Sequence, residues 1–126
     1  MQKNSKYFYG YASVFNNKDW YGDVIMEESL NIPYIELESV PLLLEHDPRK
    51  KIGMIEKVSQ NAKGVFVEGF INCDYAKKNL PLSIGYIVNK SFKCSNGIRY
   101  IQKFTLLEVS VVRKSANSMA FGFCQI

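Results

Sequence analysis

The sequence predicts a mainly β fold, a barrel or sandwich of about seven short strands with one or two short flanking helices. Three observations lead to this prediction. Short runs rich in β-branched and aromatic residues recur along the chain, clusters of turn-forming residues separate them, and two pairs of runs have the pattern of hairpins. We therefore expect a sheet that closes on itself or stacks on a second one.

The first third of the chain is predicted to contain a strand, a loop and a short helix. Residues 7–15 are aromatic and β-branched, which favours a strand, and residues 16–23 are dense in Asn, Asp and Gly, which favours a loop. An extended segment resumes at residues 24–26. Pro33 suits the first turn of a helix that runs to about Ser39.

The middle of the chain contains a buried strand and a hairpin. Residues 40–45 are mostly apolar and predict a buried strand, which we expect Asp47-Pro48 to break. Residues 51–59 alternate loosely, and residues 65–71 alternate after a turn over 60–64. This pattern predicts an antiparallel hairpin.

The last third predicts more strands. Residues 74–81 leave room only for a turn of helix, and residues 82–88 form the next strand. A second hairpin spans residues 91–104, because its Asn-Gly pair at 96–97 is a strong hairpin turn signal. Residues 106–112 alternate, which predicts one face with the odd-numbered residues and one with the even-numbered residues.

Composition and charge limit the class of protein. The 126 residues are 47% hydrophobic and 22% charged, which predicts one globular domain spanning 1–126. A net charge of +4 is smaller than expected for a dedicated nucleic-acid-binding protein. No apolar run approaches the roughly 20 residues of a membrane span, and residues 1–6 lack the apolar core of a secretory signal. We expect a soluble intracellular protein.

The spacing of the cysteines and the histidine does not favour a zinc site. Cys73, Cys94 and Cys124 are widely spaced without a Cys-x-x-Cys pair, and His46 is the single histidine. The sequence has no glycine-rich phosphate-binding motif. We therefore expect reduced thiols and no cofactor or metal.

Three residues could together carry chemistry. His46 follows an apolar strand between two acids, Ser83 stands inside an apolar strand, and Glu108 lies between Leu107 and Val109. Each also has a purely structural interpretation: a histidine at a strand end, a serine bonded to a neighbouring strand, and a carboxylate pointing out of the sheet. Together they are the nucleophile, base and orienting acid of a triad. Triads are recognised by geometry, so spacing alone leaves both interpretations open.

Five blocks of sequence, in a specific order, carry a family resemblance. They are Gly10–Phe15, Asp19–Ile25, Pro41–Asp47 with Ile52-Gly53, Leu82–Tyr86, and Leu106–Val112 followed by Ala116-Asn117. In this order they cover nearly the whole chain. The set resembles the prohead maturation proteases of tailed bacteriophages, which are distantly related to the herpesvirus assemblins.

The resemblance implies a fold and roles for single residues. It implies a serine endopeptidase on a herpesvirus-protease-like β-barrel, with Ser83 as nucleophile and His46 as general base. Glu108 matches an acidic position and is our choice for the third member, because Glu45 and Asp47 are too close in sequence to His46 to reach its far ring nitrogen easily.

The loop after the last predicted strand is the candidate for the oxyanion site. The related assemblins use an arginine-bearing loop there, which makes Arg113 and Lys114 the candidates. Simple solvated charge at a strand end is the alternative interpretation of both residues.

The resemblance also implies partners and a location. Such proteases cut the scaffold or a scaffold-like segment of the phage capsid protein, and often themselves. They do so inside the immature capsid, in the cytoplasm of the bacterial host. We further expect a homodimer, no membrane partner and no nucleic-acid partner.

Two alternative functions stay open at this point. One is a catalytically degenerate member of the same fold that acts as a capsid-assembly or scaffold component. The other is a small basic β-barrel that binds nucleic acid on an aromatic platform. For the second, the candidate platform is Tyr7, Phe8, Tyr9 and Tyr11 with Lys3 and Lys6, although we expect these aromatic side chains to pack in the barrel core.

Overall fold

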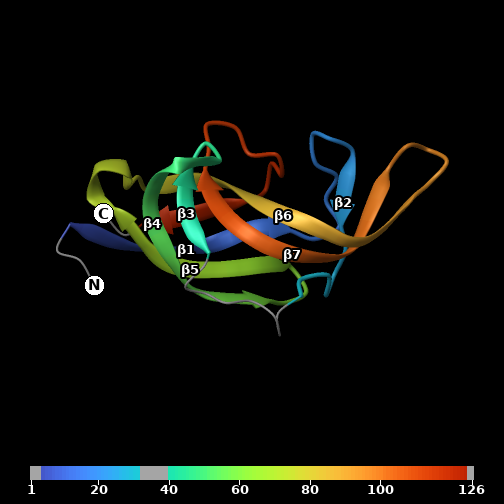
Figure 1. The fold of residues 1–126 in the computed structure, drawn as a ribbon, viewed down its shortest axis with the longest axis horizontal. Helices are drawn as coiled ribbons and strands as arrows, with labels where there is room; N and C mark the ends of the chain where they lie inside the picture. Colours follow the sequence, from blue (N-terminus) through green and yellow to red (C-terminus); the bar gives the residue numbers. More distant parts are fainter. Residues whose placement is uncertain (1–3, 32–39, 125–126) are drawn as a thin grey trace.

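Strands dominate the chain, as predicted (Figure 1). The computed structural model describes residues 4–31 and 40–124. Its strands are β1 (Ser5–Val14), β2 (Asp23–Ile25), β3 (Pro41–Leu44), β4 (Asp47–Gln60), β5 (Gly64–Asn72), β6 (Asn79–Lys93), β7 (Arg99–Val111) and β8 (Phe121–Cys124), with a 3-10 turn, η3 (Cys73–Tyr75), between β5 and β6. The helix predicted over 33–39 lies outside the described residues. Within the described ranges, no helix has the length and apolarity to cross a membrane.

Seven of the strands close into a barrel. The hydrogen-bonded order is β7-β3-β4-β5-β1-β8-β6, and β6 pairs back to β7 to complete the ring. The barrel is mixed, because β3 runs parallel to β7 while the other neighbours in the ring are antiparallel. The short β2 pairs with a separate stretch of β7, at Arg99–Ile101. The predicted barrel is therefore confirmed.

The predicted C-terminal strands fuse into one long hairpin. The runs expected as separate strands before and after the Asn-Gly turn form the continuous β6 and β7, which pair from Leu82 to Lys93. Three register shifts interrupt their ladder. Bulges of this kind bend and twist a strand pair without ending it. The outer part of the hairpin projects beyond the barrel beside β2 (Figure 1).

The expected break at Asp47-Pro48 is wrong, because the chain turns two residues earlier. Leu44 pairs with Asp47, so Glu45 and His46 form a two-residue hairpin loop and β4 begins at Asp47. Both loop residues have positive φ, 50° and 60°. This matches the twist of the flanking strands in a type I′ turn, although Asn and Gly usually occupy such positions. A left-handed conformation costs roughly 1–2 kcal/mol per non-glycine residue.

The strand that completes the ring, β8, has no counterpart among the predicted elements. It is four residues long and lies between β1 and β6. Gly10 of β1 permits its close approach, because a Cβ there would lie 2.2 Å from the Phe121 carbonyl oxygen. A short segment whose pairing depends on a distant glycine gives little local signal.

The core is lined by alternate residues of the strands, and this corrects the expected position of the N-terminal aromatic residues. Phe8 is fully buried, whereas Tyr7 and Tyr9 are 44% and 42% exposed. Successive side chains in a strand point to opposite faces, so only every second residue of this run can face inward. The outer tyrosines form an aromatic row with neighbours on β5 and β8, namely Phe66, Phe70 and Phe123.

Candidate active site

The fold brings Ser83, His46 and Glu108 into one hydrogen-bonded chain. Ser83 lies on β6, Glu108 on β7 and His46 in the β3–β4 turn. His46 Nε2 is 3.1 Å from Ser83 Oγ, and His46 Nδ1 is 2.7 Å from Glu108 Oε1. Three residues from separate parts of the sequence therefore meet in the order serine, histidine, acid.

The chemistry of the acid determines the protonation of the ring. An ionised carboxylate only accepts hydrogen bonds, so Nδ1–H of His46 donates to Glu108. In the neutral imidazole this leaves a lone pair on Nε2, which accepts from the Ser83 hydroxyl. The arrangement can take a proton from Ser83 while Glu108 stabilises the resulting imidazolium.

A bulge in β7 aims Glu108 at His46. Gly85 pairs with Glu108 and Tyr86 pairs with Leu106, so Leu107 is an extra residue that no β6 residue opposes. The strict alternation predicted over 106–112 is therefore wrong at this point. Leu106 and Val109 both face the core, whereas strict alternation would put them on opposite faces. Bulges re-aim side chains in this way.

Ser110 joins the acid to the histidine turn and was not among the predicted site residues. Its hydroxyl donates to Glu108 Oε2 at 2.8 Å and accepts the backbone N–H of His46 at 3.0 Å. It is fully buried. The sequence signal was present, since Ser110 follows Glu108 by two residues in a strand and so shares its face.

Glu108 raises the pKa of His46. The hydrogen bond to Glu108 is the largest cause, and the charges of Glu108 and Glu45 act in the same direction. Partial burial of the ring opposes them. The net direction is upward because an adjacent carboxylate stabilises the cationic ring.

Gly85 leaves the space that Glu108 occupies. A Cβ at position 85 would lie 2.6 Å from Glu108 Oε1 and 2.8 Å from its Cδ. Contacts this short do not persist, so any larger residue at position 85 must displace the carboxylate. We infer that glycine is required here for the geometry of the acid.

Gly85→Ala is accordingly expected to lower the reaction rate of Ser83 by about 10–100-fold, because the displaced Glu108 no longer orients His46. The rate is measured as covalent labelling by a serine-directed phosphonate, followed by intact mass. In a Glu108→Ala background the same substitution should have no further effect, because it acts through the carboxylate. Equal losses in both backgrounds would contradict this explanation.

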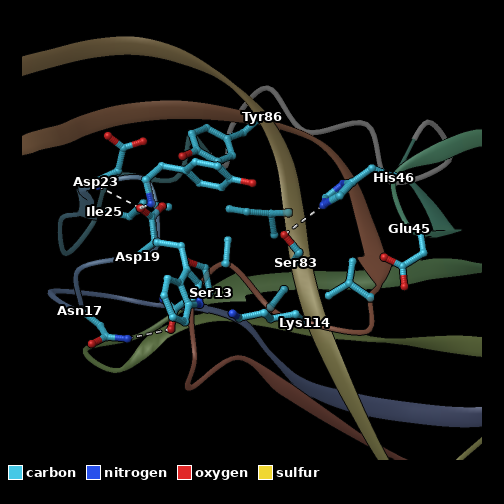
Figure 2. Close-up of a pocket in the computed structure, with 17 residues that line it drawn as sticks. Ser13, Asn17, Asp19, Asp23, Ile25, Glu45, His46, Ser83, Tyr86 and Lys114 are labelled. Carbon is cyan, nitrogen blue, oxygen red and sulfur yellow. Dashed lines mark hydrogen bonds between the residues drawn. The ribbon is translucent and has the colours of Figure 1, made fainter.

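A cleft of about 570 Å³ extends from Ser83 and His46. Figure 2 shows these two residues at one end, with Asp19, Asp23 and Tyr86 toward the other. The cleft was not predicted, because its walls come from loops far apart in the sequence.

Two loops, over residues 16–22 and 113–119, hold the walls of this cleft together. The Trp20 N–H donates to the Ala116 carbonyl at 3.1 Å, and Asn17 donates to the Asn117 side chain at 3.0 Å. Asn117 in turn donates to the Val14 carbonyl of β1. These bonds fix both loops to the barrel.

The two oxyanion candidates are differently placed. The Arg113 N–H donates to Glu45 Oε2 at 2.6 Å, and its side chain is 96% exposed. Lys114 lines the cleft, and its ammonium lies 3.8 Å from the centre of the Trp20 ring. An oxyanion role for the Arg113 amide would require exchange of its bond to Glu45, so both roles stay predictions.

The fold and the hydrogen-bonded chain define the class of protein. A serine bonded to a histidine, itself bonded to an acid, is the constellation that serine hydrolases share across unrelated folds. The model of the caudovirus prohead serine protease family matches residues 1–121. The chain belongs to this family, which confirms the resemblance seen in the sequence. A search of curated protein sequences finds no significant match.

A solved structure of a herpesvirus protease shares the fold of this chain. The structure of KSHV protease in complex with a hexapeptide phosphonate inhibitor has a TM-score of 0.62 and 14% identity over 93% of this chain. A second structure of KSHV protease has a TM-score of 0.48 and 15% identity, again over 93% of this chain. The matches cover 64% and 59% of those two chains, so this chain spans less than two thirds of their length.

Proposed function

We propose that this protein is a serine endopeptidase of phage prohead maturation, with Ser83 as nucleophile, His46 as general base and Glu108 as the orienting acid. The observation that carries the proposal is the unbroken hydrogen-bonded chain from Ser83 Oγ through both nitrogens of His46 to Glu108. Membership of the prohead serine protease family supports the same reaction class.

The proposed reaction begins with Ser83. Its Oγ attacks the carbonyl carbon of the scissile peptide bond while His46 Nε2 takes the hydroxyl proton. Collapse of the tetrahedral intermediate breaks the C–N bond, and the imidazolium returns the proton to the leaving amine. Water then hydrolyses the acyl-enzyme by the same transfers in reverse order. Glu108 stays ionised throughout and stabilises the cationic ring.

The proposed substrates follow from the family. We place the reaction inside the immature capsid, in the cytoplasm of the bacterial host, with the scaffold or a scaffold-like segment of the capsid protein as substrate and self-cleavage as a second event. A homodimer is the proposed assembly. The alternative is a member of the same fold that has lost activity and serves only in capsid assembly.

Covalent labelling of Ser83 tests the proposal. A peptidyl diphenyl phosphonate is incubated with the wild type, Ser83→Ala and His46→Ala, and intact mass is measured. The protein is held at high concentration with an excluded salt to favour a dimer. We expect one adduct in the wild type, with loss of phenol, and none in Ser83→Ala. His46→Ala should label at a small fraction of the wild-type rate.

The opposite results are equally informative. An adduct that persists in Ser83→Ala would show that another residue reacts. No adduct with folded, dimeric wild-type protein would contradict the peptidase and leave the capsid-assembly alternative. Circular dichroism of each variant shows whether the barrel is retained.

A further inference from the structure

The cleft beside Ser83 has a polar end that the proposed reaction does not use. Asp19 and Asp23 line this end, away from His46 (Figure 2). They belong to the loop before β2 and to β2 itself, which lie outside the Ser83–His46–Glu108 chain. The position of this end, in the same cleft as the nucleophile, points to a substrate-binding role.

Asp19 presents a carboxylate with unused acceptor capacity. Its Oδ1 accepts the backbone N–H groups of Tyr21 and Asp23, each at 2.9 Å. Among residues 4–31 and 40–124, no basic side chain forms an ion pair with it and no group donates to its Oδ2. Burial raises the pKa of the Asp19 carboxyl, because its charge is partly removed from water. A bound cation would offset that desolvation.

The neighbouring charges at this end are already compensated. Arg99 Nε and Nη2 bond the two carboxylate oxygens of Asp23 at 3.0 and 2.9 Å. The Lys114 ammonium is held over the ring of Trp20. The charge of Arg99 also lowers the pKa of Asp19, but Arg99 forms its bonds to Asp23, so Asp19 is the acid that keeps a free acceptor position for a ligand at this end of the cleft.

Ser13 supplies a second and independent indication of a ligand. It lies on β1, lines the same cleft and is only 1% exposed. Within the described part of the chain, its hydroxyl has no hydrogen-bond partner. A buried polar group without a partner is costly, and a bound donor or acceptor in the cleft would remove that cost.

We propose that this end of the cleft binds a cationic substrate side chain, lysine or arginine, and that Asp19 determines this specificity. The side chain is that of the residue whose carbonyl Ser83 attacks, since it leaves the chain next to the reacting carbon. Apolar lining from Ile25 and Ile84 suits the methylene stem of such a side chain. This inference rests on the proposed function.

Two matched phosphonate probes test the inference on the intact protein. They are peptidyl diphenyl phosphonates that differ only in the side chain next to phosphorus, lysine in one and norleucine in the other. In each labelling step an Oγ–P bond forms, a P–O bond to phenoxide breaks, and His46 takes the serine proton. We expect wild-type labelling by the lysine probe to be at least about tenfold faster, as for a hydrogen bond between charged groups.

Asp19→Asn separates the effect of the Asp19 charge from the effect of its hydrogen bonds. Asparagine keeps an oxygen for the Tyr21 and Asp23 N–H groups, so the loop geometry is preserved. The variant should lose at least about tenfold in rate with the lysine probe and stay within about threefold with the norleucine probe. Asp74→Asn, which removes an exposed charge outside the cleft, is the matched control and should match the wild type with both probes.

Each unfavourable outcome has a separate meaning. Norleucine labelling as fast as lysine labelling would overturn this inference and leave the proposed peptidase intact, and this wild-type comparison is decisive even if Asp19→Asn fails to fold. A lysine preference that Asp19→Asn retains would overturn the role of Asp19. No labelling by either probe would overturn the proposed function and this inference with it.

Discussion

Ser83→Ala is expected to lower kcat/KM for a cleaved peptide by roughly 10⁴–10⁶-fold, because no other group supplies the attacking oxygen. Removing the hydroxyl should leave the barrel folded, since Ser83 bonds only to the His46 ring among the described side chains. The measurement is cleavage of a quenched fluorescent peptide chosen from a peptide-library digest. Ser91→Ala, at an exposed position of the same strand, is the matched control and should retain wild-type activity.

Non-additivity strengthens the same experiment. His46→Ala should cost about as much as Ser83→Ala, and the double variant should be no slower than either, because members of a triad act as a unit. Losses that multiply in the double variant would contradict a shared step. So would a Ser83→Ala protein that cleaves at the wild-type rate.

Glu108→Gln is also expected to have a large effect and to reduce kcat/KM by about 10²–10⁴-fold. A glutamine amide can donate to Nδ1 as well as accept from it, so it no longer enforces the tautomer that leaves Nε2 free for Ser83. It also removes the charge that stabilises the imidazolium. The same peptide assay measures the loss, and a variant within a few-fold of wild type would exclude Glu108 as the orienting acid.

The pH profile of this variant provides an independent readout. In the wild type, Glu108 raises the pKa of His46 above its ordinary value of 6.5, and only the neutral ring accepts the Ser83 proton. Activity should therefore fall as pH drops through the raised pKa. In Glu108→Gln this acidic limb should move to lower pH. A wild-type profile without an acidic limb would contradict His46 as the base.

The raised pKa of His46 also affects the stability of the fold, and the stability changes with pH in the direction opposite to activity. A folded-state pKa above the unfolded value means that the folded protein binds the proton more tightly. The His46–Glu108 pair thus stabilises the fold fully below pH 6.5, and this contribution is lost as pH rises through the raised pKa. The pH window that favours catalysis is therefore the one in which the pair contributes least to stability.

Much of the candidate site could be predicted from the sequence once the five blocks were taken together. Ser83, His46 and Glu108 were named from residue type and family resemblance, and the structure places them in contact. Ser110 was missed because its role depends on the histidine turn, which lies 64 residues away in the chain. Asp19 was not among the predicted site residues: it begins one of the five blocks, but no neighbouring residue in the sequence indicates that it lines a cleft beside Ser83.

Local chemistry explains which features were predictable. Alternation, β-branched runs and the Asn-Gly pair act over a few residues, so a mainly β chain and its two hairpins could be predicted from them. The bulge at Leu107 and the positive φ angles of Glu45 and His46 depend instead on contacts with distant strands. Neither feature follows from the conformational preference of the residues involved. Each is retained because the free energy gained by closing the barrel over many strands outweighs a local backbone strain of roughly 1–3 kcal/mol.

The strand content, the family and the three residues of the proposed triad could thus all be predicted from the sequence. The folded protein was needed to reveal that β8 closes the barrel, that a bulge aims Glu108 at His46, and that a cleft runs from Ser83 to Asp19. The difference arises from the distance along the chain over which each interaction acts. Strand propensity acts between neighbours in the sequence, whereas a site assembled from a turn, two strands and two loops exists only when the whole sheet has closed.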